Sequence, residues 1–241
     1  AKVFGGGWDI VLNGGIEEAG ACKWSLSAKE DRGTWLEMSG LLRGTGGRRE
    51  LPAVFCHPRK WNGRTTVWLS GEGKDGLYGA DRKLRPEVQK LVDGGTSVVG
   101  VDLFHQGEFL ADGRPLDVTP KVRNPRESGS YTFGYNPSVF AERVTDALAV
   151  LRFVRDHEQR SSRVDLVGVD GAGVIAAAAR AQSRGLVGRA ALDLAGFRFG
   201  KLTDLRHPDF TPGGARYGDV PGLVALGVPG RTLLLGEDAI P

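Results

Sequence analysis

The chain has 241 residues, of which 40% are hydrophobic and 25% are charged, a composition that suits one large α/β domain with a real core. Its 32 basic and 29 acidic residues leave a net charge of +3 and are spread along the chain, so the charge pattern does not indicate a nucleic-acid-binding protein. There is no run of 18 apolar residues and no signal-peptide pattern. We therefore expect no membrane span, and the compartment stays open.

The two cysteines, Cys22 and Cys56, lack the spacing of a metal-binding pair, and both a disulfide and two free thiols are compatible with the sequence. The chain starts at Ala1 and stops at Pro241 within an apparent structural unit. We expect a domain of a longer protein, which would be secreted or periplasmic if the parent chain carries a signal peptide.

Residues 1–30 are rich in glycine and predict a lead-in or linker, with the α/β domain over residues 31–241. The first half of that domain alternates β-branched and apolar runs with glycine-rich turns, which is typical of strands. The nearly continuous apolar run at residues 96–103 indicates a parallel strand that is covered on both faces. The expected elements are strands at 34–43, 51–57, 64–70 and 96–103, and a helix at 86–92 with Pro86 in its first turn.

Residues 104–135 form a long irregular stretch, and loops of this length in compact domains are usually functional or disordered. Asn136 and Pro137 then predict the N-cap and first turn of an amphipathic helix over 138–157. One face of this helix carries Phe140, Val144, Ala147, Leu148, Leu151 and Val154. The elements expected after it are a strand at 164–169, a helix after Gly173, a strand at 190–194, an irregular stretch with a short helix at 196–226 and a last strand at 231–235.

Strands and helices thus alternate along most of the chain, with hairpin-like material at the front. This order predicts an α/β fold with a doubly wound, mostly parallel sheet and antiparallel strands at its N-terminal edge. The sequence shows no internal repeat and no low-complexity segment.

The turn GVDGAG, residues 168–173, lies between a predicted strand and an alanine-rich helix. It has the outline of a nucleophile elbow, G-x-S-x-G, in which a sharp turn presents the central side chain and small flanking residues let strand and helix pass closely. Asp170 stands at the central position. The amide of Gly171 would face an oxyanion, and the helix N-terminus adds partial positive charge there.

Together with other segments, this turn makes residues 51–238 resemble the α/β-hydrolase superfamily, in particular acetyl xylan esterase or cephalosporin deacetylase-like and dienelactone hydrolase-like proteins. The further segments are TTVWLSGEGKDG, GVDLFHQGE, the long helix before the turn and YGDVPGLVALGVPGRTLLLGED. The resemblance implies an α/β-hydrolase-like fold that lacks its last strand and helix. It also places Gly71 and Glu72 in the first oxyanion loop.

By the same resemblance, the family's catalytic serine maps onto Asp170 and its triad acid onto Glu237 or Asp238. The triad histidine should follow the acid, yet all four histidines precede it. Some α/β-hydrolases that open epoxides or remove halides use an aspartate at this turn, and a histidine-activated water hydrolyses the resulting ester. The candidate base for that water is His207, if its loop folds over the turn, and His105 is a candidate substrate-binding residue.

Ordinary structural roles compete with these assignments. The carboxylate of Asp170 can cap the helix that follows it, and Gly71 and Glu72 can form a plain β-to-α turn. Asp102 and Glu108 are expected to hold their loop through bonds to backbone amides. A dinucleotide-binding glycine loop is a weaker alternative for the turn, because that fingerprint belongs on the first βα unit.

Two functions follow from the sequence. The first is an acetyl xylan esterase-like domain that is catalytically degenerate, with neither the elbow serine nor a downstream histidine, and that accompanies an esterase domain of a longer protein. The second is an active hydrolase of carboxylic esters, or of epoxide or halide substrates, with Asp170 as nucleophile and a small-molecule or carbohydrate ester as ligand. Neither function requires a cofactor or a metal ion, and neither involves nucleic acid.

Overall fold

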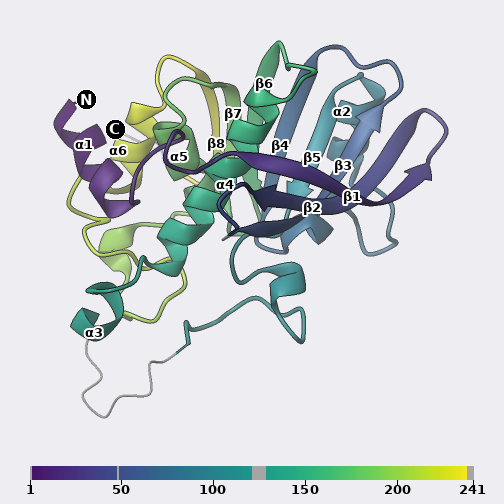
Figure 1. The fold of residues 1–241 in the computed structure, drawn as a ribbon. Helices are drawn as coiled ribbons and strands as arrows, with labels where there is room; N and C mark the ends of the chain where they lie inside the picture. Colours follow the sequence, from purple (N-terminus) through teal and green to yellow (C-terminus); the bar gives the residue numbers. More distant parts are fainter. Residues whose placement is uncertain (1, 48, 121–128, 238–241) are drawn as a thin grey trace.

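A computed structural model describes residues 2–47, 49–120 and 129–237, which form an eight-stranded sheet with helices on both faces (Figure 1). The strands are β1 (Cys22–Asp31), β2 (Trp35–Gly44), β3 (Glu50–Pro58), β4 (Arg64–Ser70), β5 (Ser97–Val101), β6 (Arg163–Val169), β7 (Val187–Asp193) and β8 (Arg231–Leu235). The α-helices are α1 (Lys2–Val11), α2 (Pro86–Asp93), α3 (Gly129–Phe133), α4 (Val139–Asp156), α5 (Gly173–Gln182) and α6 (Asp219–Leu226). The short 3-10 helices are η1 (Gly73–Leu77), η2 (Gly107–Phe109) and η3 (Phe199–Lys201).

The strand order across the sheet is β1-β2-β3-β5-β4-β6-β7-β8. Strands β1, β2 and β3 pair antiparallel, as do β3 and β5, whereas every pair from β5 to β8 is parallel. This arrangement confirms the predicted doubly wound, mostly parallel sheet with an antiparallel N-terminal edge. The chain places β5 on one side of β4 and β6 on the other, so the carboxyl ends of β4 and β6 border the crevice where such sheets bind ligands.

The core consists of two clusters, one on each face of the sheet, because successive strand residues point to opposite faces. In β4, Val67 and Leu69 belong to the larger cluster, which also contains residues of α1, α4, α5 and α6. Trp68 between them belongs to the smaller cluster with residues of α2. Burial on both faces explains why the central strands read as nearly continuous apolar runs in the sequence.

Helix α4 lies across the larger cluster, and all six residues of its predicted apolar face are at most 4% exposed. Its N-cap is Ser138, whose Oγ accepts a hydrogen bond from Ala141 N at 3.1 Å. The predicted cap at Asn136 was therefore wrong by two residues. Asn136 instead donates from its backbone and side chain to the carbonyl of Thr132 and so closes the turn after α3.

The residues expected as a lead-in carry regular structure, namely α1 and most of β1. Trp8, Leu12 and Ile16 are at most 2% exposed and belong to the larger core cluster. Trp8 Nε1 also donates to the carbonyl of Tyr217, 209 positions later in the chain, at 3.2 Å. Gly7, one of the glycines that indicated a linker, permits close packing, since a Cβ there would lie 2.5 Å from the Tyr217 ring.

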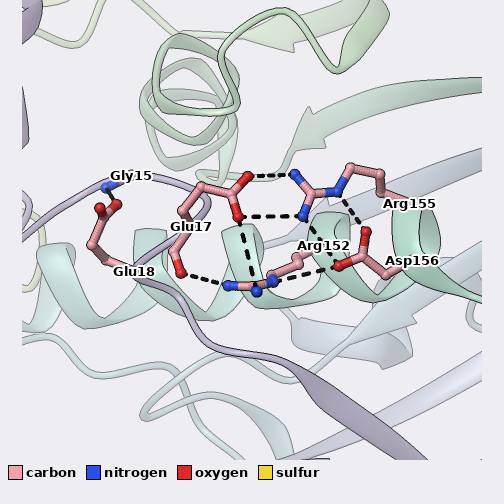
Figure 2. Close-up of polar contacts among 6 residues, drawn as sticks. All are labelled: Gly15, Glu17, Glu18, Arg152, Arg155 and Asp156. Atoms are coloured by element: carbon pink, nitrogen blue, oxygen red, sulfur yellow. Dashed lines mark hydrogen bonds and ion pairs between the residues drawn. The ribbon is translucent and has the colours of Figure 1, made fainter.

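The loop between α1 and β1 is fastened to the C-terminal half of α4 by charged groups (Figure 2). The Glu17 carboxylate pairs with Arg155 at 2.7 Å, and the Glu17 carbonyl accepts a hydrogen bond from Arg152. Arg155 also pairs with the neighbouring Asp156 at 2.7 Å. These contacts are largely exposed, so they orient the loop more than they stabilise the fold.

Both cysteines are free, which decides between the two alternatives left by the sequence. Cys56 is fully buried, and this burial raises the pKa of its thiol and makes it unreactive. In the described part of the chain, no helix combines the length and the apolar character that crossing a membrane requires.

Candidate functional site

The turn between β6 and α5 has the geometry expected of a nucleophile elbow. Asp170 adopts the left-handed backbone conformation with a φ of 52°, which costs a non-glycine residue about 1–3 kcal/mol and persists only where the surroundings enforce it. A Cβ on Gly168 would lie 2.5 Å from the Cβ of Ala176, so strand and helix pass at a distance that only glycine permits. The turn thus presents the Asp170 side chain, 37% exposed, at the carboxyl edge of the sheet.

Two side chains hold this carboxylate, one from the last residue of β4 and one from the residue before α2. Ser70 Oγ donates to Asp170 Oδ2 at 3.0 Å, and the Arg85 guanidinium lies 2.9 Å from the same oxygen. Arg85 also lies 3.5 Å from the carboxylate of Glu72. Within the described residues neither oxygen of Asp170 accepts a bond from a backbone amide, and the N-cap of α5 is Ala172. The alternative of Asp170 as a helix cap was therefore wrong, because the carboxylate turns toward Arg85.

The amides predicted to frame an oxyanion are partly engaged within the protein. Gly71 N donates to the carbonyl of Asp170 at 3.1 Å, and Glu72 N donates to Ser70 Oγ at 3.2 Å. Gly171 N has no partner among the residues that the structure describes. One available donor stabilises developing negative charge less than a converging pair does, since each donor contributes separately.

A second aspartate at the same edge, Asp102 after β5, is fully buried. Its carboxylate accepts hydrogen bonds from the backbone amides of Lys74 at 2.8 Å and Glu108 at 3.0 Å, and from Lys74 Nζ at 2.6 Å. The Glu108 carboxylate also pairs with Lys74 Nζ at 2.8 Å. Burial opposes the effect, but these bonds raise the pKa of Lys74 and keep it protonated. The predicted role of Asp102 in holding its loop is confirmed. The Glu108 side chain pairs with Lys74, and among the described residues no backbone amide donates to it.

The two candidates for the triad acid follow β8. Glu237 is 5% exposed and pairs with Arg198 through both of its oxygens, at 2.8 and 2.5 Å. Hydrogen bonding to Arg198 lowers the pKa of Glu237 below its ordinary value, so it is fully ionised at neutral pH. Asp238 lies outside the described residues. The described acid position thus faces a guanidinium from the loop after β7, where a triad would need an imidazole.

The two candidate histidines make local contacts. His207 Nδ1 accepts a hydrogen bond from Asp209 N at 3.1 Å within its own loop. The His105 ring packs against Phe104 at 4.2 Å between ring centroids, and burial together with the charge of Arg143 lowers its pKa. Across the described ranges, no hydrogen bond or ion pair joins either imidazole to Asp170. The same ranges contain no group of three or more histidine, cysteine or acidic side chains arranged to hold a metal ion.

Three residues of this edge were missed by the sequence analysis, namely Ser70, Arg85 and Arg198. Ser70 was read only as the end of a strand, and Arg85 precedes the first-turn proline of a helix without any motif of its own. Arg198 lies 39 positions from Glu237. No local spacing could have joined these arginines to their carboxylates, because each pair bridges loops that follow different strands.

Searches for similar proteins found no matching family model and no matching curated protein sequence. Solved structures do match. Acetyl xylan esterase 1 from Thermoanaerobacterium sp. JW/SL YS485 aligns over 96% of this chain and 77% of its own, with 16% identity and a TM-score of 0.58. The acetyl xylan esterase from Paenibacillus sp. R4 aligns over 97% and 78%, with 14% identity and a TM-score of 0.57. A promiscuous CE15 esterase from the marine bacterial metagenome aligns over 94% and 72%, with 12% identity and a TM-score of 0.58.

At these identities the likeness concerns the fold. The chain has an esterase-like α/β fold of the α/β-hydrolase type, with an elbow-shaped turn after β6. The chemistry of the site must be argued from its own residues, because one fold hosts many functions.

Proposed function

We propose that this chain is an acetyl xylan esterase-like domain without hydrolytic activity of its own. The observation that carries the proposal is the pairing of both described carboxylates of the site with arginines. Asp170 faces Arg85 at 2.9 Å, and Glu237 is held by Arg198 through both oxygens. In an active hydrolase of this fold, an imidazole would stand between nucleophile and acid.

The pairing opposes catalysis at each carboxylate for a different reason. An aspartate nucleophile attacks through a carboxylate oxygen, and the guanidinium and the Ser70 hydroxyl both draw electron density from Asp170 Oδ2. Hydrolysis of the resulting ester would also require a base beside it. Both oxygens of Glu237 accept from Arg198, so the guanidinium stands where an imidazole would have to be oriented by the acid.

We propose further that the domain serves as a companion or structural domain beside an active esterase domain in a longer protein. A domain without its own base would keep its fold for packing and recognition and leave hydrolysis to its neighbour. The parent reading frame on both sides of this chain tests this part, because a neighbouring domain with a complete serine triad is expected there.

An active hydrolase with Asp170 as nucleophile is the second candidate. It is favoured by the left-handed φ of Asp170, by the 37% exposure of its side chain and by the unengaged Gly171 amide among the described residues. Its substrates would be carboxylic esters, epoxides or halides. Its base would come from His207, His105 or a partner chain.

Turnover of p-nitrophenyl acetate by the purified chain separates the two candidates. We expect no hydrolysis above background for the natural chain or for Asp170→Ala. Hydrolysis well above background that disappears in Asp170→Ala would overturn the degenerate assignment. Hydrolysis gained in Asp170→Ser would show that the oxyanion site is still functional, and Arg85→Met serves as a control that removes the guanidinium while leaving the aspartate.

A further inference from the structure

A cavity of about 420 Å³ opens at the edge of the sheet opposite the elbow. Its lining includes Thr65 and Ser97 at the starts of β4 and β5, and Ser161 just before β6. Asp170 follows the end of β6, and a strand of this length spans about 20 Å. The cavity is therefore separate from the crevice at the carboxyl ends, and its volume falls within the range of small-molecule sites.

One wall of the cavity is a run of rings in edge-to-face contact. Trp24 of β1 meets Phe55 of β3 at 4.8 Å between centroids, and Phe55 meets Phe153 of α4 at 6.0 Å. Phe153 in turn meets His157 at 5.3 Å. Trp24, Phe55 and Phe153 are half-buried, whereas His157 is exposed. The three half-buried rings supply apolar surface to the cavity, and such rings favour a further aromatic ring beside them.

The polar groups of the lining include His57, which follows Phe55 by two positions on β3 and therefore points to the same face of the sheet. His57 lies across the strand pair from Leu36, its Nδ1 is 3.4 Å from Ser97 Oγ, and its ring lies 5.8 Å from Trp61. The second ring nitrogen of His57 has no partner among the described residues. Burial, and to a smaller extent the charge of His157, lowers the pKa of His57 and keeps it neutral. A neutral imidazole both donates and accepts a hydrogen bond.

We propose that this cavity binds a small phenol, with its ring between Phe55 and Trp61 and its hydroxyl on the free nitrogen of His57. The rings and the aliphatic lining supply the apolar surface, and His57 supplies the single directional contact that such sites use for orientation. An aromatic acid fits less well. Its carboxylate would lose hydrating water and would face a neutral imidazole instead of a cation. Glu158 also lines the cavity, and its negative charge would repel that carboxylate.

Calorimetric titration of the full chain with 2-naphthol tests the proposal, with ligand-observed NMR as a second readout. We expect one site per chain and tighter binding than with 2-naphthoate or 2-methylnaphthalene. His57→Phe keeps a ring and removes the nitrogens, and we expect it to weaken binding about fivefold, the worth of one hydrogen bond. Trp61→Ala lies outside the strands, so it should fold, and we expect a loss of similar size.

The matched controls are His207→Phe and Tyr135→Ala. They change a histidine and an 86% exposed aromatic residue that do not line the cavity. Both variants should bind 2-naphthol as the natural chain does. Asp170→Ala should also bind normally, so this inference and the proposed function fail independently. The inference is overturned if the natural chain does not bind 2-naphthol, or if His57→Phe and Trp61→Ala bind it as tightly as the natural chain does. Tighter binding of 2-naphthoate or 2-methylnaphthalene than of 2-naphthol would overturn it as well.

Discussion

Asp102 and Asp170 follow neighbouring parts of the same sheet edge but use their carboxylates in opposite ways. Asp102 is fully buried and bonds to the backbone of two loops and to the half-buried ammonium of Lys74. Asp170 is 37% exposed, bonds only to side chains within the described residues and sits on strained backbone. The first carboxylate therefore supports the fold, whereas the second is held by two side chains on a strained turn that the surrounding structure enforces.

The largest effect is expected from Asp102→Ala. The substitution leaves Lys74, 14% exposed, with only the exposed Glu108 carboxylate as counter-ion, and it frees two loop amides. We expect a loss of about 3–5 kcal/mol in the free energy of unfolding, measured by urea denaturation. The control Asp75→Ala removes an aspartate that is 60% exposed and should change the value by less than about 0.5 kcal/mol. Equal effects at the two positions would contradict the structural role of Asp102.

Arg198→Met is expected to have an intermediate effect that depends on pH. Arg198 lowers the pKa of Glu237, and a carboxylate whose pKa is depressed by folding stabilises the protein above its unfolded pKa and loses that contribution as the pH falls. We expect a loss of about 1–2 kcal/mol at pH 7 and a smaller difference at pH 3. Urea denaturation at both pH values measures this.

The control for this pair is Arg231→Met, an exposed arginine on the adjacent strand. It should leave the unfolding free energy nearly unchanged at both pH values. A difference between Arg198→Met and the natural chain that is constant from pH 7 to pH 3 would argue that the guanidinium acts through packing alone.

A smaller effect is expected at Asp170, and two variants separate its side chain from its backbone. Asp170→Ala removes the carboxylate and keeps the left-handed strain, whereas Asp170→Gly removes both. We expect the glycine variant to be more stable than the alanine variant by about 1 kcal/mol, because glycine adopts a φ of 52° without a Cβ clash. Equal thermal unfolding midpoints for the two variants would show that the turn relaxes in solution.

The smallest effect is expected from Arg85→Met. Its ion pair with Asp170 joins partly exposed groups, 26% and 37%, and such pairs contribute at most about 1 kcal/mol. We expect little change in the urea midpoint, in contrast to Asp102→Ala. A loss comparable with that of Asp102→Ala would mean that the Asp170 site also supports the fold.

Most of the fold was predictable because its signals are local. The nearly continuous apolar run of β5 predicted a strand buried on both faces, and the helical spacing from Phe140 to Val154 predicted α4. The front of the chain was harder to interpret. There the glycines that suggest a linker, such as Gly7, serve close packing around Trp8, and only the contact with Tyr217 reveals this.

The candidate site was predictable in place but not in partners. The small residues of GVDGAG determine a tight strand-to-helix turn wherever this segment folds, since Gly168 must let α5 pass β6. By itself the sequence thus determined the order of elements, the sheet class and the position of Asp170. Tertiary structure alone decided that Arg85 and Arg198 face the two carboxylates and that an aromatic cavity opens at the opposite edge. These contacts join segments far apart in the chain, and their geometry exists only once the sheet has brought its strand ends together.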